Sequence, residues 1–314
     1  MKILYIHIGI SKTGSSALQS YLHKNTEILQ KNNIKYVKSG RINNKDIANT
    51  YFAFTMLDKF PSWVSVNKNS DYRILIDDIA DEIKTSKEST FICSSEALSS
   101  VKDTVKLKYL KESLAGICKI VIVVYLRRPS LWLNSWYNQA LKNHPFLKMT
   151  FDDFYKTAIY EFFKTIELYS SVFGKDIMIR NYDNFKKTNS DIVIDFFTIL
   201  GKSNILEDYQ QIINTDANIT QSEEETRIFL EFNRLIDIKD RDRVGFNKDL
   251  RTLLSKYTFL VNDLDEIRMK PWQAQEFDNK YKQNIHWIEK NWKIVNLSQD
   301  WGIERNAECL LDNN

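Results

Sequence analysis

Residues 7–22, HIGISKTGSSALQSYL, join an apolar segment to an amphipathic one through a short polar loop. The apolar segment KILYIHIGI (residues 2–10) has the composition of a buried strand, and the following SALQSYLHKN has the periodicity of a helix. A glycine-containing loop between a strand and a helix exposes backbone N–H groups at the positive end of the helix dipole, which is a general site for anions. The alternative is an ordinary turn, in which Ser15 and Ser16 only cap the helix and Lys12 only lies in water.

Apolar segments of strand length recur along the chain and alternate with segments of helical periodicity. The further strands expected are IKYV (34–37), TFICSS (90–95), KIVIVVYL (119–126) and DIMIR (176–180). The helices expected between them are RILIDDIADEIK (73–84), TVKLKYLKESLAG (104–116), PSLWLNSWYNQALK (129–142) and FDDFYKTAIYEFFKTIELYSSVFG (151–174). Strands that are apolar at nearly every residue indicate a sheet covered on both faces. The pattern therefore predicts an α/β fold, with a three-layer, P-loop-like parallel sheet between helices.

The bulk composition limits the class of protein. The 314 residues are 43% hydrophobic and carry a net charge of +3, which suits a globular chain and gives no reason to expect nucleic acid as a partner. We expect one domain over residues 1–314, with an α/β core over about 1–200 and a mainly helical portion over about 201–314. No apolar segment reaches the roughly 18 residues that span a bilayer. The three cysteines, Cys93, Cys118 and Cys309, are far apart and fit neither a disulfide framework nor a zinc site, so we expect a cytoplasmic protein.

The loop departs from the ATP and GTP pattern G-x-x-x-x-G-K-[ST]. Gly9 and Gly14 have the required separation, but Ser15 stands where that pattern needs lysine. The lysine comes before the second glycine instead, as Lys12. A lysine at this earlier position reaches a different part of a bound anion.

The sequence KTGSS resembles the 5′-phosphosulfate loop of sulfotransferases that use 3′-phosphoadenosine 5′-phosphosulfate (PAPS). The longer pattern HIG-x-x-KTG-[ST]-[ST]-x-LQ is similar to bacterial, carbohydrate-type members of that superfamily. The matching residues are His7, Gly9, Lys12, Thr13, Gly14, Ser15, Ser16, Leu18 and Gln19. The resemblance implies PAPS as donor, 3′-phosphoadenosine-5′-phosphate (PAP) as product, a hydroxyl-bearing acceptor such as a glycan, and no required metal.

PAPS carries a 3′-phosphate, so a second anion site is needed. The strand KIVIVVYL ends in Arg127-Arg128-Pro129, and Ser135 follows on the next helix. This segment resembles the sulfotransferase 3′-phosphate motif, R-x-P with a serine eight residues after the arginine. Arginine suits the task because its planar fork binds phosphate through two charge-assisted hydrogen bonds. The alternative is that these arginines are surface charges at a strand end and that the serine is incidental.

The resemblance covers about residues 1–200 and implies roles for single residues. Lys12 would stabilise the leaving oxygen, and Thr13, Gly14, Ser15 and Ser16 would hold the 5′ groups. In the same superfamily, the segment IMIRNYDNF corresponds to a late strand and turn, in which Arg180 and Tyr182 would be structural.

Two residues compete for the role of general base. Glu96 follows a predicted buried strand, where parallel-sheet enzymes place their sites, although it could equally be a first-turn helix carboxylate. His7 has a suitable ordinary pKa, although a histidine within a strand is more often packed in the core.

The sequence constrains the identity of the acceptor and the choice among other functions less than it constrains the donor. Trp132 and Trp136 lie four residues apart on one helical face, where they could stack on a sugar or fill the core. The helical C-terminal portion would shape the acceptor site. The alternatives to a sulfotransferase are a nucleoside-triphosphate-dependent kinase or ATPase with an altered phosphate loop, and a catalytically silent nucleotide-binding relative. Nothing in the sequence indicates an oligomeric state.

Overall fold

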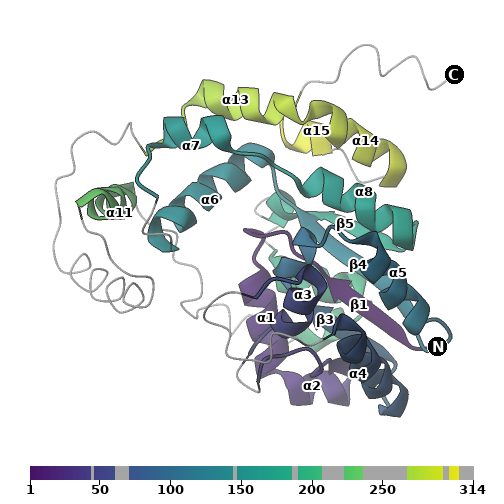
Figure 1. Ribbon diagram of the computed structural model, residues 1–314. Coiled ribbons are helices and arrows are strands. Elements are labelled where there is room, and N and C mark those ends of the chain that lie inside the picture. The colour runs from purple at the N-terminus through teal and green to yellow at the C-terminus, as the bar shows by residue number, and fades with distance from the viewer. Residues whose placement is uncertain are drawn as a thin grey trace, which may run out of the picture. The chain divides into compact units, whose positions relative to one another are not determined.

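The computed structural model describes residues 1–43, 46–60, 71–143, 147–185, 190–206, 223–235, 267–292 and 297–303 (Figure 1). The chain forms two compact units. The core unit comprises Met1–Arg127, Glu161–Ala217 and Trp287–Asp300, and the helical unit comprises Arg128–Tyr160, Asn218–His286 and Trp301–Asn314. The helices that follow the strand ending at Leu126 thus cluster with helices from the C-terminal part of the chain.

The core unit contains a five-stranded parallel sheet in the order β2-β3-β1-β4-β5. The strands are β1 (Ile3–His7), β2 (Ile34–Tyr36), β3 (Thr90–Ser94), β4 (Lys119–Leu126) and β5 (Ile177–Asn181). All five predicted strands are therefore confirmed to within a few residues. The central strand β1 pairs with β3 through Ile6 and Cys93 and with β4 through Ile6 and Ile122, so its carboxyl end lies between theirs.

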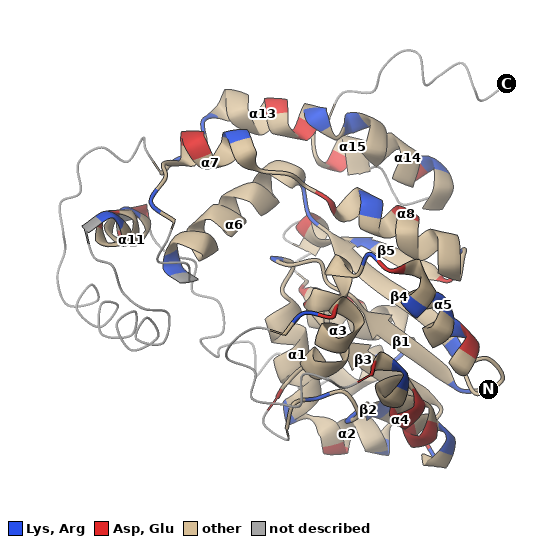
Figure 2. Cartoon of the chain, in the orientation of Figure 1, with Lys and Arg blue, Asp and Glu red and all other residues tan. Residues whose placement is uncertain are grey.

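Helices cover both faces of the sheet, which explains why the strands are apolar at nearly every residue. One face packs against α1 (Ser15–Lys24), α2 (Thr26–Lys31) and α10 (Ile192–Ile199), in a core that includes Leu22, Tyr125 and Phe196. The helices α4 (Tyr72–Thr85), α5 (Thr104–Ser113) and α8 (Phe162–Phe173) lie side by side on the other face (Figure 1). Figure 2 shows the central strands mostly free of charged residues, which gather on helices and loops. The predicted three-layer α/β class is confirmed.

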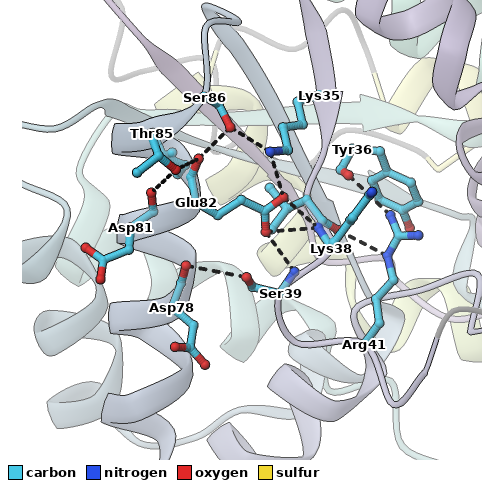
Figure 3. A network of polar contacts seen from close by, with 12 residues as sticks. Lys35, Tyr36, Lys38, Ser39, Arg41, Asp78, Asp81, Glu82, Thr85 and Ser86 are labelled. Atoms are coloured by element: carbon cyan, nitrogen blue, oxygen red, sulfur yellow. Dashed lines mark hydrogen bonds and ion pairs between the residues drawn. The ribbon is translucent and has the colours of Figure 1, made fainter.

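The edge strand β2 is secured by a polar network around Glu82 of α4 (Figure 3). The Glu82 carboxylate accepts hydrogen bonds from the backbone N–H groups of Lys38, at 3.0 Å, and Ser39, at 2.8 Å. The Lys35 ammonium lies 3.3 Å from the same carboxylate. The guanidinium of Arg41 stacks over the ring of Tyr36 at 4.0 Å from its centroid. The described contacts of this carboxylate are all with donors, which stabilise its negative charge.

The helical unit is built around α6 (Pro129–Asn143). It contacts α7 (Phe151–Thr157), α11 (Glu223–Leu235) and α13 (Pro271–Lys280). The buried Asn233 side chain of α11 donates to the carbonyls of Leu141, at 2.9 Å, and Leu147, at 3.0 Å. These bonds satisfy backbone oxygens at and beyond the end of α6.

The single helical pattern predicted over 151–174 is wrong, because α7 ends at Thr157 and α8 begins at Phe162. Ala158 has extended backbone angles, φ −73° and ψ 138°, which stop the first helix. The backbone N–H of Tyr160 donates to the Tyr281 hydroxyl at 2.6 Å, a partner that no local pattern could indicate.

The remaining elements are mostly short. They are α3 (Thr50–Leu57), η1 (Glu96–Ser100), η2 (Tyr182–Asn184), η3 (Ser203–Leu206), α14 (Lys282–Trp292) and α15 (Leu297–Asp300). Within the described ranges no helix is long and apolar enough to cross a membrane. Cys93 and Cys118 are unpaired thiols, and Cys309 lies outside the described residues.

Candidate active site

The loop between β1 and α1 lies at the carboxyl end of the sheet. Backbone bonds join its first half to β4: Ile8 N–H donates to Val123 at 3.0 Å, Ile10 N–H donates to Tyr125 at 3.2 Å, and Tyr125 N–H donates to the Gly9 carbonyl at 2.8 Å. The Ser95 N–H, just after β3, donates to the His7 carbonyl at 3.0 Å. The ends of three neighbouring strands therefore meet around this loop, where open α/β sheets bind their ligands.

Three residues of the loop adopt left-handed backbone angles. Gly9 has φ +95° and Gly14 has φ +78°. A Cβ atom on Gly9 would lie 3.1 Å from Glu96, and one on Gly14 would lie 3.2 Å from Tyr182 and from Ile192. Both glycines are thus required by conformation and by space.

The third left-handed residue is Lys12, with φ 68°. This conformation is uncommon for residues with a long side chain and tends to persist at functional sites, where the surroundings enforce it. The sequence did not predict this conformation, because the residue type lysine gives no indication of a positive φ. With this backbone conformation, the Lys12 carbonyl accepts a hydrogen bond from Arg127.

The serines do not cap α1, so the capping part of that alternative is wrong. The N-cap is Gly14, which has no side chain to accept a hydrogen bond from the helix N–H groups. Ser15 is in the first turn and donates its hydroxyl to the Ile10 carbonyl at 3.4 Å, and the Thr13 hydroxyl donates to the same carbonyl at 2.6 Å. Ser16 is exposed in the first turn. Two of the hydroxyls thus hold the loop together, and the N-cap residue itself supplies no side chain at the positive end of the helix dipole.

Arg127 connects the two segments that the sequence singled out. Its Nη1 atom donates to the Lys12 carbonyl at 2.9 Å, across a sequence separation of 115 residues. Its Nε atom lies 3.7 Å from a carboxylate oxygen of Asp183, and its guanidinium lies over the Tyr182 ring, 5.6 Å from the centroid. The Tyr182 ring thus lies beside both Arg127 and Gly14. This position is consistent with the structural role predicted for Tyr182.

The charges of Lys12 and Glu96 are close enough to influence each other. Burial lowers the pKa of Lys12; the charge of Glu96 opposes this shift and that of Arg127 adds to it. The Glu96 side chain reaches solvent, but the protein atoms crowded around its carboxyl raise its pKa, an effect that the charge of Lys12 only partly offsets. Both groups are thus shifted toward their neutral forms, as often occurs where ionisable groups perform chemistry.

His7 lies in the core and not on the surface of the loop. Its side chain has no exposed area, and its ring makes edge contacts with Tyr125 and Phe196 at centroid distances of 5.7 and 6.2 Å. Burial lowers the pKa of His7 to about 3, so the imidazole is neutral. A buried ring in this position matches the core interpretation and gives His7 no direct path to an acceptor.

Ser135 and the paired tryptophans belong to the helical unit. Trp132 is buried, stacks on Trp136 with ring centroids 6.3 Å apart and planes inclined by 7°, and contacts Tyr160 edge-on at 5.2 Å. Ser135 and Trp136 are half-buried. The packing of Trp132 favours its interpretation as a core residue, and the roles predicted for Ser135 and for this acceptor-side portion stay predictions.

A buried carboxylate, Asp278 of α13, was missed by sequence reasoning. It accepts hydrogen bonds from the Arg128 Nε at 2.6 Å and from the backbone N–H and hydroxyl of Ser130, each at 2.8 Å. Arg128 is thus engaged inside the helical unit, which distinguishes it from Arg127. No group of three or more His, Cys, Asp or Glu side chains suited to a metal ion occurs among the residues described.

Comparisons with known proteins give few matches. No family model matches the chain. An uncharacterised protein of Archaeoglobus fulgidus is 29% identical over 153 residues, which make up 48% of this chain and 40% of that protein. The match therefore spans less than half the length of this relative.

Two solved structures are similar in fold. One is a sulfotransferase from Alicyclobacillus acidocaldarius, 14% identical, with a TM-score of 0.37 over 73% of this chain and 91% of that one. The other is a retinol dehydratase in complex with androsterone and the inactive cofactor PAP, 12% identical, with a TM-score of 0.31 over 98% of this chain and 84% of that one.

Proposed function

We propose that the chain is a sulfotransferase that moves a sulfuryl group from PAPS to an acceptor hydroxyl. One observation supports this most strongly: the Arg127 guanidinium donates to the carbonyl of Lys12, beside a helix N-terminus whose N-cap residue is a glycine. The two segments that resemble PAPS-binding motifs thus lie close enough for one nucleotide to contact both. The identity of the loop residues and the missing lysine after Gly14 favour this donor over a nucleoside triphosphate.

Each loop residue has a role in holding the donor. The backbone N–H groups of Gly14, Ser15 and Ser16, at the start of α1, bind the 5′-phosphosulfate with the help of the helix dipole. Thr13 acts by fixing the loop, because its hydroxyl is committed to the Ile10 carbonyl. Arg127, at the end of β4 beside the loop, attracts the 3′-phosphate through the charge of its guanidinium. The role of Ser135 at that phosphate rests on the sequence resemblance alone.

The transfer itself needs a cation and a base. The acceptor oxygen forms a bond to sulfur while the bond from sulfur to the bridging oxygen of the donor breaks, leaving PAP. Negative charge develops on that bridging oxygen, and the Lys12 ammonium stabilises it. The acceptor proton passes to the Glu96 carboxylate.

Glu96 suits the role of base better than His7. Its side chain reaches solvent beside the loop, and its raised pKa makes it a stronger proton acceptor than an ordinary glutamate. His7, in contrast, is buried and its pKa is lowered to about 3. A glycan is the acceptor class that the carbohydrate-type resemblance implies.

The donor assignment is tested by thermal shift with PAP and with adenosine 5′-phosphate, which lacks the 3′-phosphate. At a PAP concentration about 100 times its Kd the folded state gains about 2.7 kcal/mol. We expect adenosine 5′-phosphate to give a much smaller shift, and Arg127→Gln to lose most of the difference between the two nucleotides. The exposed Arg73 of α4 supplies the matched control, Arg73→Gln, which should keep it.

Other outcomes would redirect the assignment. Equal stabilisation by both nucleotides would remove the role given to Arg127 and Ser135. Magnesium-dependent hydrolysis of ATP would favour the kinase or ATPase alternative. PAP binding with no sulfuryl transfer to a panel of glycan and small hydroxyl acceptors would favour a catalytically silent relative.

A further inference from the structure

Ser94 occupies a junction beneath the proposed site. It is the last residue of β3, it has no exposed area, and it lies two residues before Glu96. Its hydroxyl is 2.8 Å from the His7 Nδ1 atom and accepts a hydrogen bond from the Gln19 side-chain amide at 3.2 Å. The Ser94 hydroxyl, at the end of β3, thus contacts a residue of β1 and a residue of α1.

The backbone of Ser94 is held as firmly as its side chain. Its N–H donates to the Asn49 side-chain oxygen, and its carbonyl accepts from the Asn49 N–H, both at 2.9 Å. His7 and Asn49 have no exposed area and Gln19 is 6% exposed, so water does not compete with these bonds. In such surroundings a polar group that loses its partner is costly, and the network is therefore specific in its geometry.

The Ser94 side chain also interacts with Tyr36 of β2, but its partners His7 and Gln19 lie on opposite sides of the anion loop. His7 is the last residue of β1, immediately before the loop, and Gln19 is in the second turn of α1, immediately after it. Both belong to the extended HIG-x-x-KTG-[ST]-[ST]-x-LQ pattern, yet the proposed function assigns neither residue a contact with the donor. Their common contact is the residue that leads into Glu96.

We propose that Ser94 is a positioning residue that sets the placement of Glu96 relative to Lys12, by tying both ends of the anion loop to the end of β3. This inference rests on the proposed function and assigns a purpose to His7 and Gln19 within it. The close approach of Gly9 to Glu96, where an added Cβ would come within 3.1 Å, leaves little space for either segment to shift separately. A displacement of about 1 Å between reacting groups can reduce a rate about 100-fold.

The His7 ring depends on this junction. Its Nε2 atom is buried and has no hydrogen-bond partner among the described residues, so the Ser94 hydroxyl is the polar contact that orients the imidazole. Removing the hydroxyl would leave the imidazole and the Gln19 amide without this partner. Both would then repack, and the loop, held internally by the bonds of Thr13 and Ser15 to the Ile10 carbonyl, would shift as a unit relative to Glu96.

The test compares Ser94→Ala and Gln19→Met with Thr55→Val. Thr55 is a matched control because it is also a buried hydroxyl, and its bond to the Phe52 carbonyl, at 2.8 Å, stays within α3. We expect Ser94→Ala and Gln19→Met to lower kcat roughly 10- to 100-fold with little change in the KM for PAPS, because the donor contacts are retained. Thr55→Val should change neither.

The double variant Ser94→Ala/Gln19→Met separates positioning from stability. It removes both the hydroxyl and the amide, so only the His7 imidazole is left without its partner, and we expect its Tm to recover part of the way toward wild type relative to Ser94→Ala. Turnover should stay low, because the tie between α1 and β3 is still absent. Recovery of turnover together with Tm, or a kcat for Ser94→Ala equal to that of Thr55→Val, would overturn the positioning role.

Amide hydrogen exchange measures the link between the anion loop and the end of β3 without requiring enzymatic turnover. In Ser94→Ala we expect faster exchange in residues 8–19 and in residues 95–100 together, and in neither for Thr55→Val. Faster exchange confined to 95–100 would overturn the inference, whatever the activity. Wild-type protein that exchanges as expected but neither binds PAP nor transfers a sulfuryl group would instead count against the proposed function.

Discussion

Two carboxylates of the core unit, Glu82 and Glu96, show opposite electrostatic behaviour. Burial works to raise the pKa of Glu82, but hydrogen bonds from the Ser39 and Lys38 backbones and the charge of Lys35 outweigh it and lower the pKa below its ordinary 4.5 (Figure 3). For Glu96, which is exposed, the desolvation by protein atoms crowded around its carboxyl prevails over the charge of the nearby Lys12, and the pKa is raised above 4.5. Neighbouring donors stabilise the ionised form of Glu82, whereas the surroundings of Glu96 do not fully stabilise its ionised form.

The same contrast holds for the lysines beside them. Lys35 lies 3.3 Å from the Glu82 carboxylate and 2.6 Å from the Ser86 hydroxyl, so it completes a structural network. Lys12 is shifted toward its neutral form by burial, and the loop that carries it has three left-handed residues. Incomplete compensation costs folding free energy, and such sites are where function is to be sought. The predictions that follow test this division between a structural and a functional carboxylate.

The largest expected effect is on turnover in Glu96→Gln. The amide cannot accept the acceptor proton, so kcat should fall about 10²- to 10⁴-fold while PAP still binds. Sulfuryl transfer measured by release of PAP, with binding measured by thermal shift, separates the two quantities. The exposed Glu112 of α5 supplies the control, Glu112→Gln, which should retain full activity.

The pH dependence of the wild-type rate sharpens the same prediction. Because the pKa of Glu96 is raised, the rate should increase with pH along a limb centred above 4.5, and Glu96→Gln should lack that limb. An identical limb in the variant would show that another group is the base.

Lys12→Met should reduce turnover about 10²- to 10³-fold, because the methionine keeps the length of the side chain but removes the charge at the leaving oxygen. Lys24, exposed in the last turn of α1, gives the matched control Lys24→Met. Full activity of Lys12→Met in the same PAP-release measurement would contradict the mechanism and would make Lys12 a structural residue like Lys35.

Glu82→Ala should reduce stability and leave turnover unchanged. It removes the acceptor for the N–H groups of Lys38 and Ser39, of which the second is partly buried, so we expect a loss of about 1–3 kcal/mol in the free energy of unfolding. Urea denaturation measures it. Asp81→Ala is the control, since Asp81 is 73% exposed and pairs only with the exposed Lys84 among the described ion pairs, a contact worth less than about 1 kcal/mol.

The sequence predicted the sheet and the loop because both leave short-range signals. Strands such as β4 are apolar throughout, and the KTGSS segment has a distinctive order of residue types. The structure also brings Lys12 within electrostatic reach of Glu96 and Arg127, and all three follow parallel strands whose carboxyl ends share one edge of the sheet.

What could not be predicted depends on long-range contacts or on tertiary context. The left-handed Lys12 has its carbonyl held by Arg127, and the break between α7 and α8 uses the Tyr281 hydroxyl. The serine caps failed because Gly14 takes the N-cap position in a left-handed conformation, which places Ser15 inside the helix. In each case a partner far along the chain, or a neighbouring glycine, decided the geometry.

The smallest effects are on the pH dependence of stability, where the two carboxylates should act with opposite sign and in separate ranges. A lowered folded-state pKa means that Glu82 contributes stability in full above 4.5 and loses it as the pH falls through the lowered value. A raised folded-state pKa means that Glu96 favours the folded state below 4.5 and that this contribution is lost as the pH rises through the raised value. In urea denaturation, the destabilisation caused by Glu82→Ala should therefore shrink below pH 4.5. Glu96→Gln should gain stability relative to wild type only above it, and a constant difference across pH for either variant would contradict the division between them.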